Sequence, residues 1–209
     1  MIIGLSGTIG CGKDTVADYL VNIHRFKREA FANSLKEAMA VIFGWEWALL
    51  EGRSKESREW REQVDPWWAE RLNMPALTPR YVLQYVGTEV IRQHFADDMW
   101  IASLENRLRQ RTDNVVITDV RFVNEIKMLK SLGAQCIEVR RGQLPDYYDI
   151  ARLANAGDDV AKQKLVDMNV HKSETNWIGS EFDHVLDNNG SFDDLYANID
   201  NALGLHVEA

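Results

Sequence analysis

The chain begins with residues 1–15, MIIGLSGTIGCGKDT, in which a short apolar run leads directly into a glycine-rich turn that ends in a lysine. Gly7 and Gly12 stand five positions apart with Lys13 next, which matches the P-loop pattern G-x-x-x-x-G-K. Gly10 adds a third position where the backbone can approach a phosphate closely. The amides of such a loop, and the positive end of the helix that follows, favour an anion. The stretch therefore predicts a strand, a phosphate-binding loop and a helix, with a nucleoside triphosphate as the ligand.

The residue after the lysine departs from the P-loop pattern. A Ser or Thr at that position normally contacts magnesium, and this chain has Asp14, followed by Thr15. Either side chain offers an oxygen to the metal, directly or through water. The alternative is a glycine-rich turn with an incidental lysine, which the order of strand, loop, lysine and helix disfavours.

The composition indicates one α/β domain with insertions or small lobes, in a chain of 209 residues. No run approaches the ~18 apolar residues of a membrane span, and no leader-like segment opens the chain, so we expect a cytoplasmic protein with no membrane partner. With 24 Lys+Arg against 32 Asp+Glu, the formal charge of −8 argues against a nucleic-acid partner. Cys11 and Cys136 are too few for a metal cluster and are expected to be free thiols.

Apolar spacing predicts strands that alternate with helices. Val16, Leu20 and Ile23 mark the first helix, and Thr78-Pro79 is typical of a helix N-cap followed by proline. Ser191 and Asp194 form a capping box at the last helix. The other expected elements are a helix over 32–43, the Thr78 helix to about 95, strands over 114–119, 134–140 and 184–186, and a helix over 122–132 closed by Gly133.

Two segments carry little periodicity. Residues 44–77 hold five of the seven tryptophans among many charges, which indicates an irregular, partly helical insertion, and 141–180 is polar and weakly periodic. The tryptophans at 45, 47, 67 and 68 form either a dimer surface or the core of a small lobe. We favour the lobe core, and the oligomeric state stays open between monomer and homodimer.

Charged residues follow two of the expected strands, where a parallel sheet places ligands. Asp119 and Arg121 follow the strand over 114–119, and Arg140 and Arg141 follow the next one. An acid at a strand end can position magnesium or its water, and an arginine two residues later can grip a phosphate. The alternative is a structural pair between Arg121 and Glu125.

The Thr78 helix has two distinct faces. One side carries Arg80, Gln84, Gly87, Thr88 and Ile91 at helical spacing. Gly87 weakens a helix, so we expect another backbone, or a flat ring such as a base, to approach it closely. The apolar stripe on the other side consists of Val82, Leu83, Val86 and Val90. The alternative is a solvated polar face with an incidental glycine.

Together these segments resemble the bacteriophage deoxynucleoside monophosphate kinases, a branch of the P-loop nucleoside-monophosphate kinase fold. The motifs that carry the resemblance are LSGTIGCGKDT, TPRYVLQYVGTEVIR, TDVRFVNE, HKSE at 171–174 and LDNNGS. The resemblance implies a single P-loop kinase domain over 1–209, with three layers around a central parallel sheet. It also implies a helical acceptor-binding insertion over 33–100 and a mobile lid over 141–180.

The resemblance further implies transfer of a phosphoryl group from ATP to a deoxynucleoside 5′-monophosphate for phage DNA precursor synthesis, with Mg²⁺ and in the cytoplasm of the infected host. The implied catalytic residues are Lys13, Arg121 and Arg141. The implied ATP site consists of Gly7, Gly10, Gly12, Lys13, Asp14, Thr15 and Asn189, and the implied metal ligands are Asp14, Thr15 and Asp119. The implied substrate site consists of Arg80, Gln84, Gly87, Thr88, Asp119, Arg121, Arg152 and His171. Arg140, Arg141 or Arg152 would close over the transferred group, His171 would position the lid, and Trp100 would pack in the core.

Three other functions remain open on the sequence. A dephospho-coenzyme A kinase shares the P-loop and the lid, a P-loop switch would bind a protein partner, and a nucleic-acid 5′-end kinase would need a less acidic chain. The preferred base and the discrimination against ribose are not specified by any motif, because Gln84 can both donate and accept hydrogen bonds.

Overall fold

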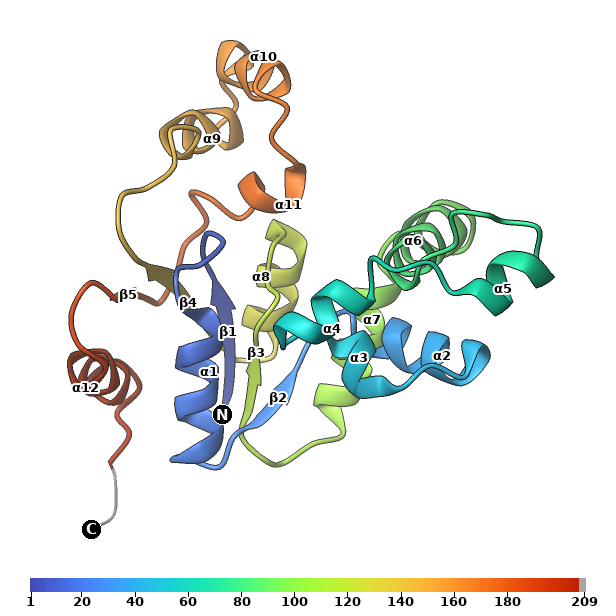
Figure 1. Cartoon of the computed structure of the whole chain (residues 1–209). Helices are drawn as coiled ribbons and strands as arrows, with labels where there is room; N and C mark the ends of the chain where they lie inside the picture. The colour runs from blue at the N-terminus through green and yellow to red at the C-terminus, as the bar shows by residue number, and fades with distance from the viewer. Residues whose placement is uncertain (207–209) are drawn as a thin grey trace. The chain divides into compact units, whose positions relative to one another are not determined.

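The computed structural model describes residues 1–206 of the chain (Figure 1). The chain divides into two compact units. The first contains residues 1–30 and the chain from Arg109 onward, and the second contains Phe31–Leu108. None of the helices described is long and apolar enough to cross a membrane.

The first unit is built on a sheet of five parallel strands in the order β2-β3-β1-β4-β5. The central strand β1 pairs with β3 through Ile3 and Val116, and with β4 through Gly4 and Cys136. Because all strands run the same way, their carboxyl ends share one edge, and the P-loop leaves β1 at that edge. The strands are β1 (Ile2–Ser6), β2 (Lys27–Glu29), β3 (Val115–Ile117), β4 (Gln135–Arg140) and β5 (His184–Asp187).

Helices cover both faces of this sheet. Helices α1 (Lys13–Asn22) and α12 (Phe192–Leu203) share one buried core with the side chains of β1 and β4. Helix α8 (Val123–Ser131) packs on the other face, where a Cβ at Gly4 would lie 2.8 Å from Leu129 Cδ1. The predicted three-layer α/β fold is therefore confirmed.

Between β4 and β5 the chain forms three helices where the sequence indicated only a polar, weakly periodic segment. They are α9 (Tyr148–Asn155), α10 (Asp159–Asp167) and α11 (Lys172–Thr175). The buried face of α9 consists of Tyr148, Ala151 and Ala154, and that of α10 of Ala161. Asp158 caps α10 by accepting a 2.9 Å hydrogen bond from the Ala161 amide.

The second unit is helical. It contains α2 (Asn33–Phe43), α3 (Trp47–Glu51), α4 (Lys55–Trp60), α5 (Pro66–Arg71), α6 (Pro79–Gln84), a π-helix η1 (Tyr85–Gln93) and α7 (Met99–Arg109), whose last residue lies past the boundary. The sequence had suggested neither α7 nor the short, charged strand β2. As predicted, Thr78 Oγ1 caps α6 by accepting a 3.1 Å hydrogen bond from the Tyr81 amide, with Pro79 as the first helical residue.

Tryptophans build much of the core of the second unit. Trp45 is buried with Leu35, Met39 and Leu50, and Trp60, Trp68 and Trp100 pack against this cluster. The Trp45 Nε1 group donates a 2.7 Å hydrogen bond to Asp65 Oδ2, so its polar atom is satisfied. The lobe-core role that we expected therefore holds for Trp45 and Trp68, whereas Trp67 is 61 % exposed.

Candidate active site

The P-loop backbone adopts conformations that require glycine. Gly7, Gly10 and Gly12 have φ values of +148°, +79° and +102°. A Cβ at Gly7 would lie 2.5 Å from the Val139 carbonyl oxygen, and one at Gly12 would lie 2.2 Å from Asn188 Nδ2. Packing and dihedral angle thus both fix the loop at the end of β1.

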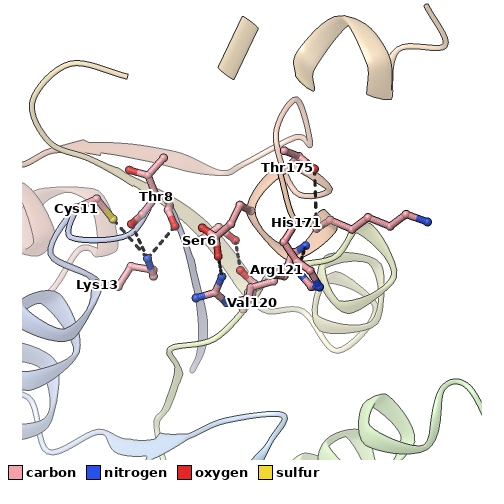
Figure 2. A network of polar contacts seen from close by, with 12 residues as sticks. Ser6, Thr8, Cys11, Lys13, Val120, Arg121, His171 and Thr175 are labelled. Atoms are coloured by element: carbon pink, nitrogen blue, oxygen red, sulfur yellow. Dashed lines mark hydrogen bonds and ion pairs between the residues drawn. The ribbon is translucent and has the colours of Figure 1, made fainter. Parts of the chain in front are cut away.

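Lys13 folds back over this loop (Figure 2). Its Nζ donates hydrogen bonds to the carbonyl oxygens of Gly7 at 2.7 Å and Thr8 at 2.9 Å, and lies 3.6 Å from Cys11 Sγ. The ammonium group is therefore held at the mouth of the loop by carbonyl oxygens, which phosphate oxygens can replace.

Asn188 stabilises the backbone of the P-loop, a role that the sequence does not predict. It is 8 % exposed, and its Nδ2 donates a 2.9 Å hydrogen bond to the Cys11 carbonyl oxygen. Its neighbour Asn189, the predicted residue, instead accepts a hydrogen bond from the Gly142 amide and binds Asp187. Both lie in the predicted turn after β5, and only the three-dimensional packing separates their roles.

The two cysteines are free and buried, as expected. Burial raises the pKa of the Cys136 thiol to about 11, so this thiol stays protonated at neutral pH.

Arg28, on β2, binds the carboxylate of Asp14, the side chain that the sequence predicts as a magnesium ligand. Its Nη1 lies 2.9 Å from Asp14 Oδ1, and its Nη2 binds Asp18 Oδ1 at 2.8 Å and the Asp14 carbonyl oxygen at 3.2 Å. The Asp14 side chain is 80 % exposed and its other oxygen remains accessible. Thr15 follows on the first turn of α1 and is half-buried.

The donor set suits a magnesium ion that arrives with a nucleotide. Within residues 1–206 no group of three or more His, Cys, Asp or Glu side chains is placed to hold a metal. Mg²⁺ usually keeps several waters and uses only one or two carboxylates together with substrate phosphates. Asp14 and Thr15 at the P-loop, with the half-buried Asp119 after β3, fit that requirement.

The residues after β3 form a second polar network, drawn in Figure 2. Ser6 Oγ donates a 3.1 Å hydrogen bond to the Val120 carbonyl oxygen, which ties the end of β1 to this segment. The Arg121 guanidinium forms an ion pair with Glu174, on α11. Glu125 instead accepts hydrogen bonds from the backbone amides of Arg121, at 2.7 Å, and Phe122, at 3.0 Å.

The expected alternative of an Arg121–Glu125 pair thus takes another form, because Glu125 caps the start of α8 and binds Arg121 through its backbone amide, while the guanidinium pairs with Glu174. Glu174, the last residue of the HKSE motif, is the partner that sequence spacing does not reveal. Tyr147 lies near this pair, and burial together with the Glu174 charge raises its pKa.

The arginines proposed for the lid differ in their surroundings. Arg140 binds the buried Glu138 at 2.9 Å and 2.7 Å and contacts Tyr148, and the hydrogen bond to Glu138 raises its pKa. Arg141 is exposed, and Arg152 on α9 lies 3.5 Å from Asp149. His171 caps α11, where its Nδ1 accepts a 3.2 Å hydrogen bond from the Ser173 amide.

In the second unit, the predicted acceptor residues lie on α6 and η1. Arg80 forms an ion pair with Glu62, while Gln84 and Thr88 are exposed. Gly87 is buried, and a Cβ there would lie 2.7 Å from Leu35 Cδ2. The close approach at Gly87 is thus made by a leucine side chain, and no ligand is needed to explain the glycine.

The π-helical winding changes which residues share a face. Hydrogen bonds from i to i+5 replace those of the α-helix over Tyr85–Gln93. Val90, expected in the apolar stripe with Val82, is 41 % exposed as a result. Trp100 packs in the core as expected, and its Nε1 donates a 2.9 Å hydrogen bond to the Gly87 carbonyl oxygen.

Comparison with known proteins adds a family match. The deoxynucleotide monophosphate kinase family matches residues 69–199. A protein of Acanthamoeba polyphaga mimivirus that carries the assignment deoxynucleotide monophosphate kinase is 30 % identical over 95 % of this chain and 94 % of its own length. The deoxynucleoside-5′-monophosphate kinase of Escherichia phage T5 is 28 % identical over 62 % of this chain and 72 % of its own. Among solved structures, shikimate kinase from Aquifex aeolicus aligns over 98 % of this chain and 96 % of its own, with 12 % identity and a TM-score of 0.45.

Proposed function

The chain belongs to the deoxynucleotide monophosphate kinase family, and from this premise we propose that it transfers the γ-phosphoryl group of ATP to deoxynucleoside 5′-monophosphates. The products are ADP and a deoxynucleoside diphosphate. The observation that carries the proposal is a glycine-built P-loop with Lys13 at its mouth, at the end of the central strand of a chain with this family match. The reaction supplies DNA precursors, and the bacterial cytoplasm of an infected host is where a phage enzyme would perform it.

The P-loop holds the donor. Its amides bind the phosphates of ATP, and Lys13 exchanges the carbonyl oxygens of Gly7 and Thr8 for oxygens of the outer phosphates. The loop is already shaped before ATP arrives, because Asn188 and the glycines fix its backbone. Binding therefore costs little ordering.

A magnesium ion bound with ATP would supply positive charge against the phosphates of the transferred group. Asp14 and Thr15 at the P-loop, with Asp119 after β3, are the residues that would hold it. Arg28 fixes the Asp14 carboxylate, so this residue positions the metal ligand.

The acceptor phosphate can act as the nucleophile without being activated. It is already an oxyanion at neutral pH, so no general base is required, and catalysis consists of alignment and charge compensation. Arg121 and Arg141 supply positive charge at the transferred group, and Arg152 does so from α9. His171 keeps α11 in shape through its N-cap, which in turn presents Glu174 to Arg121.

Arg80 and Gln84 bind the monophosphate in the second unit. Arg80 offers two donors to the 5′-phosphate, and Gln84 reads an edge of the base. Thr88, which is exposed on η1, completes that face, whereas Gly87 packs against Leu35 and lies outside it. The working unit is a monomer or a homodimer.

A coupled ADP-release assay tests the proposal. ATP and Mg²⁺ are mixed with each deoxynucleoside monophosphate in turn, with dephospho-coenzyme A, and with water alone. We expect ADP release that depends on a deoxynucleoside monophosphate. Release with dephospho-coenzyme A only would indicate a different kinase, and release with water alone would indicate a hydrolytic switch.

A further inference from the structure

A second arginine stands next to Arg80 without a partner of its own. Arg61, the residue after α4, is half-buried, and its Nε is enclosed without any hydrogen-bond partner. Its guanidinium makes no hydrogen bond or ion pair to another residue of the part of the chain that the structure describes. A guanidinium remains charged at any physiological pH, and burying a charge without a partner destabilises a fold. An anion that bound at this position would neutralise the charge of Arg61.

The guanidinium of Arg61 packs closely against the backbone of Gly52. A Cβ at Gly52 would lie 2.2 Å from Arg61 Cζ, and within 2.5 Å of both terminal nitrogens. Gly52 has a φ of +77° and ends α3, so the chain turns closely around the arginine. A surface arginine is free to swing into water, whereas this one is packed before any ligand binds.

Arg61 and Arg80 are joined through their backbones. The Arg80 amide donates a 2.9 Å hydrogen bond to the Arg61 carbonyl oxygen. Burial is the main cause that lowers the pKa of Arg61, and the nearby charge of Arg80 lowers it further. Arg58 adds to this effect, and Glu62 partly offsets it. Two cations that repel each other in the free protein are stabilised when a dianion lies between them.

We infer that Arg61 and Arg80 together bind the 5′-phosphate of the acceptor nucleotide, with Arg61 as the pre-positioned ligand. The inference rests on the proposed function. Glu62 holds Arg80 while no nucleotide is bound, through an ion pair whose two side chains are 56 % and 41 % exposed. Pairs this exposed contribute little stability, so a phosphate dianion displaces Glu62 at small cost. A phosphate has three free oxygens, enough for two arginine forks.

The experiment compares Arg61→Met with Arg58→Met. Both variants remove a guanidinium from the same short segment, but Arg58 is exposed and its Nη1 only donates to the Arg53 carbonyl oxygen. For each variant, calorimetry measures the binding of the best monophosphate and of its nucleoside, which lacks the phosphate. Assays then measure KM for the monophosphate and for ATP, and thermal unfolding measures stability.

We expect Arg61→Met to weaken monophosphate binding at least about tenfold, as loss of a charge-assisted contact does. Nucleoside binding and the KM for ATP should change by less than about twofold, and Tm should hold or rise because an unpaired charge is gone. Arg61→Lys keeps one charge but lacks the two-pronged guanidinium, so its affinity for the monophosphate should lie between that of the parent and that of Arg61→Met. Arg58→Met should resemble the parent.

Two results would overturn the inference. One is unchanged monophosphate binding in Arg61→Met, and the other is an equal loss for nucleoside and monophosphate with a lowered Tm, which would indicate a structural arginine. If Arg61→Met does not fold, Arg61→Lys alone decides between these results. A parent protein that phosphorylates no monophosphate would instead refute the proposed function.

Discussion

The side-chain amide of Asn188 donates a 2.9 Å hydrogen bond to the carbonyl oxygen of Cys11, inside the P-loop. This bond joins the turn after β5 to the turn after β1, two segments 177 positions apart. It also places Nδ2 directly against Gly12, where a Cβ would come within 2.2 Å. The shape of the phosphate-binding loop therefore depends on a residue near the far end of the sequence.

Replacing Asn188 with alanine should loosen the loop. The substitution leaves the Cys11 carbonyl oxygen without its partner, which we expect to cost about 1–3 kcal/mol of unfolding free energy. The KM for ATP should rise more than the KM for the monophosphate. Asn189→Ala is the matched control, since Asn189 binds Gly142 and Asp187 instead. Steady-state kinetics in which Asn189→Ala proved the more damaging for ATP would reverse the two roles.

The Asp14 carboxylate should control the response to magnesium. Asp14→Asn should shift the magnesium dependence of turnover to higher concentration by roughly tenfold, the usual effect of disturbing the groups around a metal. Asp18→Asn serves as a control, because Asp18 shares Arg28 with Asp14 but lies a turn further along α1. An unchanged curve for Asp14→Asn would transfer the metal to Thr15 or Asp119.

Arg80 and Gln84 should affect the acceptor and not the donor. Arg80→Ala should raise the KM for the monophosphate at least about tenfold and lower turnover, because a misplaced acceptor loses its alignment with ATP. Gln84→Ala should alter the ranking among the four bases more than the rate with the best one. If Arg80→Ala instead raised the KM for ATP and left the KM for the monophosphate unchanged, the donor and acceptor sites would be assigned the wrong way round.

Stability should fall in strong base partly because of Tyr148. Burial and the 2.5 Å hydrogen bond from its hydroxyl to Glu138 raise the pKa of Tyr148 to about 12. The unfolded chain loses this proton near pH 10, so between pH 10 and 12 it binds fewer protons than the folded chain, and unfolding becomes easier. The contribution lost is about 2 to 3 kcal/mol at the upper end. Urea titrations from pH 9 to 12 should show a flatter decline for Tyr148→Phe, and equal slopes would contradict this.

Four of the five strands could be predicted from sequence because their signals are local, whereas the short, charged β2 could not. A few consecutive residues are enough to recognise the apolar run before Gly7, the apolar strand after Asn114 and the capping box at Ser191. The helices of 141–180 could not be predicted, because few large apolar positions mark them: α9 buries Tyr148 with two alanines, and α10 and α11 bury only Ala161 and Thr175 among the described residues. The face of η1 was misassigned at Val90 for another reason, since its π-helical winding depends on packing within the second unit.

The candidate site was predictable only in part. Motif spacing finds Lys13, because the P-loop is a contiguous pattern. It cannot find Asn188, Glu174 or Arg28, whose relevance comes from the residues that they bind, nor Arg61, whose relevance comes from a buried Nε without a hydrogen-bond partner. Asn188 and Asn189 illustrate the limit: adjacent and chemically identical, they differ only in which way each side chain points.

Turnover of Lys13→Met with ATP and the best deoxynucleoside monophosphate tests the central claim most directly. Lys13 lies at the mouth of the P-loop, where its Nζ binds the carbonyl oxygens of Gly7 and Thr8 and the Cys11 sulfur. If it neutralises charge on the outer phosphates of ATP, the variant should keep its fold by circular dichroism. Formation of the deoxynucleoside diphosphate should then be at least ~10²-fold slower, about 2.7 kcal/mol of barrier. Diphosphate formation within a few-fold of the parent rate would contradict the account.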